Sequence, residues 1–223
     1  MAYECSGGSN TDLVECLATK GLITSGRVKE AMLSVDRGHY SPTGPYEDRP
    51  QSIGHKATIS APHMHASACE SLLGYLTPGA KVLDIGSGSG YLTHVLAELV
   101  KPDGVVIGVD HIQPLVDLAR ENMAKSPEGR EMLESGAVKF VKADGRKGCP
   151  DEGPYDAIHV GAAAADHQEK LEQQLKAPGR MFIPVEKGYM QHIWIVDKDE
   201  EGKMKYTKDI GVQYVPLTDA PQY

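Results

Sequence analysis

The chain has 223 residues, 40% of them apolar, which is enough to bury one substantial core and fits a single α/β domain. With 24 Gly and 14 Pro but no recurring period, the composition excludes collagen-like and repeat proteins, and the ordinary apolar content excludes a disordered chain. The net charge is −8 and no run of Lys or Arg exceeds two residues, so nucleic acid is a poor partner.

Apolar stretches such as 105–109 have the length of a strand, far short of the roughly 18 residues that cross a bilayer, so no membrane partner is expected. The N-terminal residues lack the basic-then-apolar layout of a secretion signal. The cysteines at positions 5, 16, 69 and 149 form no Cys-x-x-Cys pair and show no metal-ligand spacing. We therefore expect a soluble cytoplasmic protein with four reduced thiols and no bound metal.

The first 79 residues predict helices and one loop. Residues 10–12 can cap a helix that ends at Gly21, and a second helix fits 27–35. Turn formers dominate 41–50 and predict an irregular loop. A third helix, with Pro in its first turn and an apolar stripe, is expected over 63–76.

From residue 80 onward, strands and helices alternate. The expected strands are 81–86, 105–110, 138–144, 155–160 and 181–185, the helices 91–100, 114–124 and 167–175, and the C-terminal hairpin pairs 191–197 with 204–210. This alternation predicts an α/β fold with a Rossmann-like, doubly wound, mostly parallel sheet and helices on both faces. We expect a single domain, 1–223, in which a helical N-terminal and substrate-loop region (1–79) precedes the Rossmann-like core (80–223).

A glycine-rich turn follows the strand at 81–86, where Asp84 precedes Gly86, Gly88 and Gly90. Glycines at a strand end allow a sharp turn and the close approach of a ligand. The third glycine comes one position too early for a dinucleotide fingerprint, and a carboxylate beside the loop suits a ligand with a cationic end. By itself, the turn is equally compatible with a purely structural role.

Two more acids close the following strands. Asp110 ends the next strand, where a carboxylate can accept both hydroxyls of a ribose, and Asp144-Gly145 ends the one after, where a carboxylate can accept from an adenine amine. One Asp after a strand is commonly a helix cap, but three in register describe an adenosine with a cationic amino-acid tail. The expected cofactor is therefore S-adenosyl-L-methionine, with S-adenosyl-L-homocysteine as its product.

These residues resemble the nucleotide site of Rossmann-like methyltransferases. The segments 51–54 and 57–65, which include Thr58, Ile59 and Ser60, resemble the signature of one branch, the protein-L-isoaspartate (D-aspartate) O-methyltransferases. The similarity extends through 154–163, 174–175, 179–180 and 214–219, is closest to the eukaryotic form and covers nearly the whole chain.

The resemblance implies a repair enzyme that methylates the free carboxylate of L-isoaspartyl and D-aspartyl residues in damaged proteins and peptides, working as a monomer. It implies Ser60 as the catalytic residue and a substrate site formed by Thr58, Ser60, Val215 and Leu217. The implied cofactor-binding residues are Ile59, Ser60, Ala61, Pro62, His63, Met64, Asp84, Gly86, Gly88, Ser89, Asp110, His111, Asp144, Gly145 and Thr218.

The residues themselves agree with a carboxylate acceptor, because no convincing nucleophile–base–orienter triad can be found. A carboxyl group with a pKa of about 4 is already ionised near pH 7 and needs no general base. The remaining task is to aim the acceptor oxygen and exclude water, for which Ser60 and backbone groups near Val215 and Leu217 are the candidates. Alternatively, Ser60 caps the helix that begins at Pro62, and His159 is a satisfied core histidine.

Three rival functions stay open at this point. One is a methyltransferase for a small hydroxylated molecule or for nucleic acid, although the Asn/Asp-Pro-Pro-aromatic loop common in base methylation is missing. A dehydrogenase fits less well, since the glycine spacing differs and no Tyr-x-x-x-Lys pair occurs. The third is a non-catalytic binder of damaged proteins, which an assay for a base-labile methyl group on an isoaspartyl peptide would distinguish.

Overall fold

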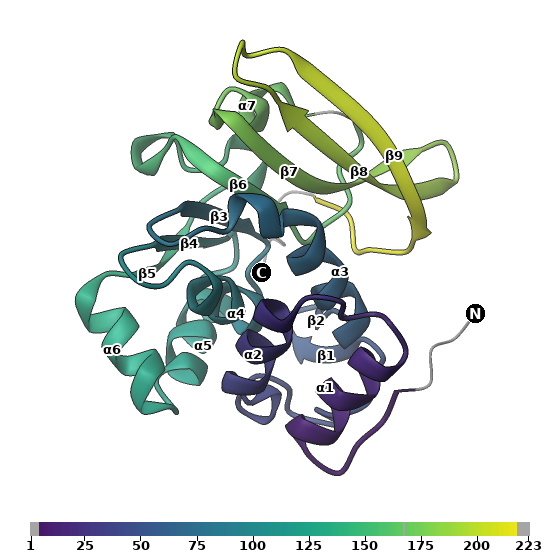
Figure 1. Ribbon diagram of the computed structural model, residues 1–223, viewed down its shortest axis with the longest axis vertical. Coiled ribbons are helices and arrows are strands. Elements are labelled where there is room, and N and C mark those ends of the chain that lie inside the picture. Colours follow the sequence, from purple (N-terminus) through teal and green to yellow (C-terminus); the bar gives the residue numbers. More distant parts are fainter. Residues whose placement is uncertain (1–4, 167, 218–223) are drawn as a thin grey trace.

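The computed structural model describes residues 5–166 and 168–217 (Figure 1). Its main strands are β3 (Lys81–Ile85), β4 (Val105–Asp110), β5 (Val138–Lys142), β6 (Tyr155–Val160), β7 (Leu175–Lys187), β8 (Met190–Lys198) and β9 (Met204–Val212). They form one sheet in the order β5-β4-β3-β6-β7-β8-β9, parallel from β5 to β7 and antiparallel at β8 and β9. The predicted α/β architecture and its C-terminal hairpin are confirmed.

Successive residues of the central strands enter two cores on opposite faces of the sheet. In β3, Val82 joins one cluster, whereas Leu83 and Ile85 join the other, as the alternation of a strand requires. The first core packs against α1 (Asn10–Thr19), α2 (Gly26–Ser34), α3 (Pro62–Leu72), α4 (Tyr91–Leu99), α5 (Gln113–Met123) and α6 (Pro127–Ser135). The second includes Leu171 of the short helix α7 (Glu169–Glu172).

Several helix boundaries differ from the sequence predictions. The side chain of Ser9, and not of residues 10–12, caps α1 by accepting from the Asp12 amide at 3.2 Å. Helix α3 stops at Leu72 and continues as one 3-10 turn, Leu73–Tyr75. Helix α6 had no counterpart in the sequence prediction; Ser126 caps it and Pro127 lies in its first turn.

The segment 167–179 is the largest error of the sequence prediction. Only Glu169–Glu172 is helical among its described residues, and β7 already begins at Leu175. Residues 177–179, expected to end a helix, lie within the strand beside a register shift between Tyr155 and Ala157 of β6. The backbone pairing of Tyr155 with Gln174 and Leu175 therefore outweighs the local helical spacing.

A small antiparallel hairpin was also missed. It consists of β1 (Gln51–Gly54) and β2 (Ala57–Ile59), joined by a two-residue turn at His55 and Lys56. Both turn residues are left-handed, with φ of 52° and 59°. Such turns usually carry Asn or Gly, so the sequence offers no ordinary hairpin signal here. The hairpin leads directly into Ser60 and α3.

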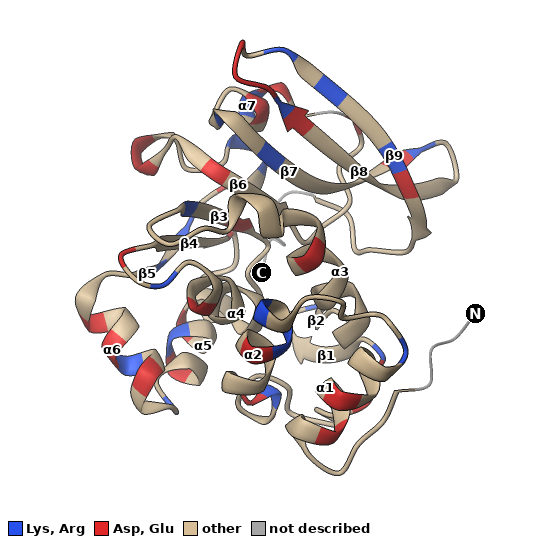
Figure 2. Cartoon of the chain, in the orientation of Figure 1, with Lys and Arg blue, Asp and Glu red and all other residues tan. Residues whose placement is uncertain are grey.

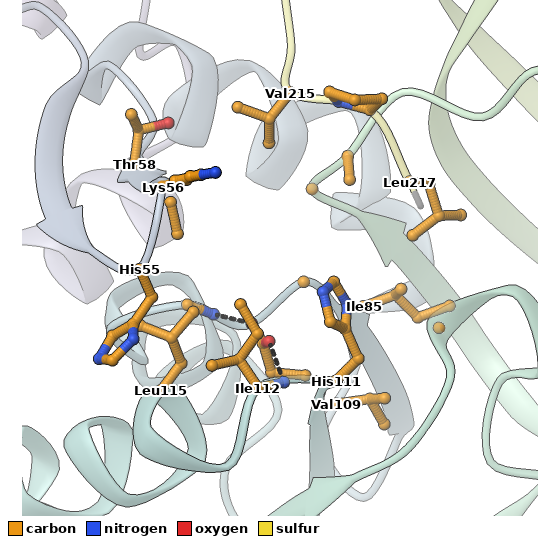
Figure 3. Close-up of a pocket in the computed structure, with 18 residues that line it drawn as sticks. His55, Lys56, Thr58, Ile85, Val109, His111, Ile112, Leu115, Val215 and Leu217 are labelled. Carbon is orange, nitrogen blue, oxygen red and sulfur yellow. Dashed lines mark hydrogen bonds between the residues drawn. The ribbon is translucent and has the colours of Figure 1, made fainter. Parts of the chain in front are cut away.

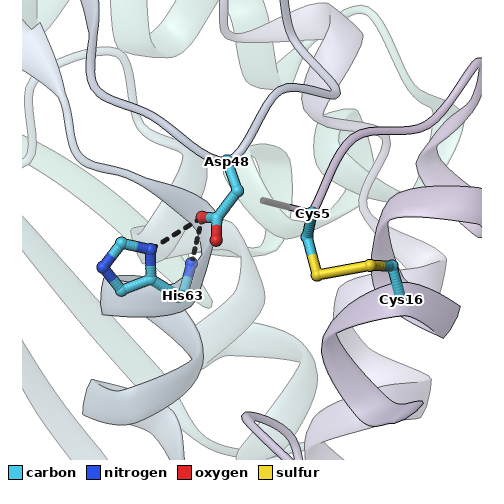
Figure 4. The surroundings of a disulfide bond; sticks show 4 residues. All are labelled: Cys5, Cys16, Asp48 and His63. Carbon is cyan, nitrogen blue, oxygen red and sulfur yellow. Dashed lines mark hydrogen bonds and ion pairs between the residues drawn. A yellow bond between two sulfur atoms is a disulfide. The ribbon is translucent and has the colours of Figure 1, made fainter. Parts of the chain in front are cut away.

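Two of the four cysteines are not free thiols. Cys5 and Cys16 form a disulfide, with their Cα atoms 5.7 Å apart (Figure 4). The N-terminal segment folds back over α1 because the amide of Gly7 donates to Tyr46 and the carbonyl of Cys5 accepts from Asp48. Sequence spacing could not show this return of the chain. Cys69 and Cys149 are free, and burial raises the pKa of both thiols.

Charged side chains are mixed over the molecule. In Figure 2, acidic and basic positions occur together on α2, α5 and α6 and on the β8–β9 hairpin, whereas α1 carries acidic positions alone. Within residues 5–166 and 168–217, no helix has the length and apolar character of a bilayer span, and no three His, Cys, Asp or Glu side chains gather as metal ligands would.

The buried histidine His94 predicts how stability depends on pH. Burial lowers the pKa of His94 to about 4, and the Tyr40 hydroxyl lies 2.6 Å from its Nδ1. Between about pH 6.5 and 4 the unfolded chain therefore binds a proton that the folded chain does not. We expect the free energy of unfolding to fall as the pH is lowered through this window, by up to about 1.4 kcal/mol per pH unit for this group.

Urea unfolding at a series of pH values tests this expectation. His94→Gln should give a shallower dependence between pH 6.5 and 4, whatever its effect on stability at pH 7. An unchanged slope would show that His94 is not the titrating group.

Candidate active site

Two adjoining cavities lie at the carboxyl ends of the parallel strands, where β3 separates β4 from β6. The larger has a volume of about 330 Å³ and is bounded by the β1–β2 turn, the end of β4, the start of α5 and residues 215–217 (Figure 3). The smaller lies around Ser60, Asp84 and His159. Thr58 and the loop glycines Gly86, Gly88 and Gly161 line both, so the two cavities are continuous.

Gly86 and Gly161 pack closely together and leave this region free of side chains. A side chain on Gly161 would place its Cβ 3.1 Å from the carbonyl oxygen of Gly86 and 3.2 Å from that of Ile85. Gly86 itself has a φ of 75°. A larger residue at either position would strain the backbone or push the loops after β3 and β6 apart, and the backbones of these loops line both cavities.

Asp110 lies at the end of β4 as predicted and lines the larger cavity. Its two carboxylate oxygens accept from the backbone amides of Gly88 at 3.1 Å and Ile112 at 3.0 Å. Burial raises the pKa of the Asp110 carboxyl, and these amide bonds oppose the rise. The carboxylate is thereby held in one orientation at the cavity wall, next to the apolar side chains of Ile112 and Leu115.

Asp84 lines the smaller cavity and is almost fully buried. One oxygen accepts from the Thr93 hydroxyl at 2.5 Å, and the other lies 2.8 Å from Nδ1 of His159. His159 is buried and stacks on Phe182, as expected for a core histidine, but it also connects β6 to the acid of β3. The carboxylate thus sits in a polar cluster at the strand ends.

Asp144 differs from its two counterparts. Its carboxylate accepts from Nε and Nη2 of Arg146 at 2.9 and 3.0 Å, which lowers the pKa of the Asp144 carboxyl. It also caps the 3-10 turn Gly145–Lys147 by accepting from the Arg146 amide. Gly145 lines the larger cavity, whereas Asp144 does not. Contact of Asp144 with an adenine amine stays a prediction.

Ser60 is not a helix cap. The N-cap of α3 is Ala61, without any side-chain hydrogen bond, so the alternative role considered for Ser60 is wrong. The Ser60 hydroxyl instead shares a hydrogen bond with the hydroxyl of Tyr214, whose pKa is raised by burial. Gln191 of β8 fixes Tyr214 through both backbone groups, at 2.6 Å to the amide and 3.2 Å to the carbonyl.

The buried side chain of Arg37 holds the backbone of Ser60. The sequence analysis did not identify Arg37 as part of the site. Nη2 donates to the Ser60 carbonyl at 2.6 Å, and Nη1 lies 3.1 Å from Nδ1 of His65. The guanidinium also lies 4.9 Å from the ring centre of Tyr91. Burial lowers the pKa of Arg37 to about 10 and holds the pKa of His65 well below its ordinary range, so Arg37 is the cation and His65 the acceptor.

The segment 214–217 closes the larger cavity from the other side. The carbonyl of Val215 accepts from the Ala163 amide at 2.8 Å, and the amide of Leu217 donates to the Ala163 carbonyl at 2.7 Å. These two backbone groups, expected to hold a substrate peptide, are therefore already paired. Val215 and Leu217 present their side chains to the cavity (Figure 3).

The remaining predicted positions fall into three groups. Ile59, Ser89 and His111 line one of the two cavities. Ala61, Pro62, His63 and Met64 belong to the start of α3 and line neither; His63 is bound through its amide and Nδ1 to Asp48, at 2.9 and 2.8 Å (Figure 4). Thr218 lies outside the described residues.

Comparison with known proteins decides the family. The model of the protein-L-isoaspartate(D-aspartate) O-methyltransferase family matches residues 8–222. The chain belongs to this family. A protein-L-isoaspartate O-methyltransferase from Caenorhabditis elegans is 44% identical over 98% of this chain and 96% of its own, and one from Methanopyrus kandleri is 47% identical over 92% and 89%. A Plasmodium falciparum structure of this class, in complex with S-adenosyl-L-homocysteine, has a TM-score of 0.88 at 34% identity, covering 95% of this chain and 99% of its own.

The larger cavity of this methyltransferase fits an adenosine. Asp110 supplies a rigid acceptor for ribose hydroxyls, and Ile112 and Leu115 supply an apolar wall for a base. The glycine floor lets the remainder of a ligand pass toward Asp84 and Ser60 in the smaller cavity. The residues present therefore suit S-adenosylmethionine, the cofactor of the family.

Arg37→Lys should lower the free energy of unfolding by about 1–3 kcal/mol, because one ammonium cannot replace the fork that bonds both the Ser60 carbonyl and His65. Urea denaturation at pH 7 measures the change. Arg130→Lys is the matched control, since Arg130 also bonds a carbonyl, that of Ala124 at 2.7 Å, but at an exposed site. Equal losses in the two variants would contradict the structural role of Arg37.

Asp110→Ala should weaken binding of S-adenosylmethionine about ten- to hundredfold, since charge-assisted hydrogen bonds of about 1.5–3 kcal/mol are lost. Titration calorimetry of the folded variant measures this affinity, and Glu121→Ala on the exposed face of α5 is the control. Unchanged affinity in Asp110→Ala would place the ribose elsewhere.

Proposed function

We propose that the chain transfers a methyl group from S-adenosylmethionine to the free α-carboxylate of isoaspartyl residues in damaged proteins and peptides, with Ser60 aiming the acceptor. The supporting observation is the position of the Ser60 hydroxyl in the smaller cavity, bonded to Tyr214 and facing the same space as Asp84. D-aspartyl residues, which the family name includes, are the second substrate we propose.

The bound cofactor supplies an electrophilic methyl group on a sulfonium. Asp110 and the glycine loop would hold its nucleoside part, and Asp84 would face its cationic end, because a carboxylate in the smaller cavity attracts positive charge. Thr58 lines both cavities and so connects the nucleoside side with the acceptor side.

The acceptor brings its own nucleophile. An isoaspartyl α-carboxylate is ionised near pH 7, so no residue of the chain has to remove a proton. Ser60 and Tyr214 each carry a hydroxyl that can donate to one carboxylate oxygen and leave the other free. Burial of Tyr214 raises the pKa of its hydroxyl, so it stays protonated and remains a donor.

Position, and not acid–base chemistry, then sets the rate. Arg37 fixes the Ser60 backbone, and Gln191 fixes the Tyr214 backbone, so both hydroxyls are carried by anchored segments. Misplacement of a reacting atom by about 1 Å can cost on the order of a hundredfold in rate. In a normal aspartyl residue, the free carboxylate and the peptide bond occupy each other's positions compared with an isoaspartyl residue, so the site should reject it.

A matched pair of synthetic peptides that differ only in the Asp linkage tests the proposal. We expect the isoaspartyl peptide to release base-labile methanol at least a hundredfold faster than the aspartyl peptide. Comparable rates would contradict a repair function and indicate a general carboxyl methyltransferase. No methyl transfer to either peptide would favour a non-catalytic binder.

In the same assay, Ser60→Ala should lower turnover while its affinity for S-adenosylmethionine stays within a few-fold of wild type. Tyr214→Phe removes the partner hydroxyl and is the companion variant. Full activity of both would exclude the hydroxyl pair from aiming the acceptor.

The monomeric state and the cytoplasmic location stay predictions.

A further inference from the structure

We propose that Lys56 is a specificity residue that favours isoaspartyl peptides carrying an acidic side chain close to the damaged residue. The inference rests on the proposed function, since it concerns the peptide whose isoaspartyl carboxylate enters the adjoining smaller cavity. Lys56 is the one Lys or Arg among the described residues that line either of the two cavities.

The β1–β2 turn fixes where this cation projects. Gly54 pairs with Ala57, so His55 and Lys56 alone make the turn, and both adopt the left-handed conformation. The turn places the Lys56 side chain over the mouth of the larger cavity, with its ammonium directed inward between Thr58 and Val215 (Figure 3). Lys56 is exposed, and no hydrogen bond or ion pair to another described residue is seen for it.

The position of Lys56 excludes the methyl acceptor itself as its partner. Ser60, Asp84 and His159 surround the smaller cavity, which Lys56 does not line. An ammonium bound to the reacting oxygen would also withdraw the electron pair that attacks the methyl group. Lys56 faces instead the stretch between Thr58 and Val215, two of the residues predicted to bind substrate, so we expect the chain next to an isoaspartyl residue to pass there.

Charge makes the preference specific. The whole chain carries a net charge of −8, so a peptide rich in acids is repelled at long range. Asp110, the acid that lines the larger cavity, is already bonded to two backbone amides. A carboxylate that reaches the cavity mouth therefore finds one fixed positive charge. A neutral or basic side chain gains nothing from it.

The experiment uses short peptides that each contain one isoaspartyl residue. In each peptide a single Glu or Gln is placed either directly before or directly after this residue. For wild type, we expect KM to be about two- to fivefold lower for Glu than for Gln at one or more positions, with kcat unchanged, as for a partly exposed ion pair. The preference should shrink when the ionic strength is raised from about 0.05 to about 0.5 M.

Four variants complete the test. Lys56→Gln should abolish the preference and Lys56→Glu should reverse it, whereas Lys20→Gln, the same charge change at the exposed end of α1, should keep it. Lys56→Asn, which suits the left-handed backbone, shows whether any effect of Lys56→Gln comes from a disturbed turn.

The outcomes are separable from those of the proposed function. Methylation of the Gln peptides reports on that function without requiring any acid. If these peptides are methylated and the Glu peptides have the same KM, or if the preference survives in Lys56→Gln, the inference is overturned. It is also overturned if Lys56→Gln weakens the binding of S-adenosylmethionine and leaves the KM for every peptide unchanged.

Discussion

Parallel pairing of β3 with β4 on one side and with β6 on the other is the constraint on which the site depends. It brings Asp84, Asp110 and Gly161 to one edge of the sheet, although they are far apart in the sequence. Because β4 and β6 lie on opposite sides of β3, the loops that follow these strands leave a cavity between them. The glycines at the ends of β3 and β6 then let the two loop backbones meet without side chains between them.

The N-terminal region completes this edge through buried polar contacts. Arg37 bonds the Ser60 carbonyl and His65, while Asp48 bonds the start of α3 through His63. A buried guanidinium is unfavourable unless its donors find partners, and Nη1 and Nη2 of Arg37 find theirs in His65 and Ser60, so these contacts tie the N-terminal region to the site. The disulfide joins Cys5 to Cys16 of α1, and backbone hydrogen bonds of Cys5 and Gly7 join the same segment to the 46–48 loop.

The C-terminal strands contribute the remaining wall. Residues 214–217 leave β9 and pair with Ala163, so Val215 and Leu217 face the cavity from a backbone that is already hydrogen-bonded. Tyr214 meets Ser60 across the sheet edge. This side of the two cavities is thus assembled from three parts of the chain, the 58–60 segment, the loop after β6 and the residues after β9.

The sequence alone determined the alternating elements, the glycine turn after β3 and the acids at successive strand ends, because these patterns are local and periodic. It also carried the family resemblance, through motifs whose residues are contiguous. Only the tertiary structure decided the distant partners: the pairing of Ser60 with Tyr214 and of Cys5 with Cys16 joins groups whose approach depends on how loops return. The same holds for β7, where a neighbouring strand overrides local helical spacing, and for the turn that aims Lys56, whose left-handed residues carry no ordinary turn signal.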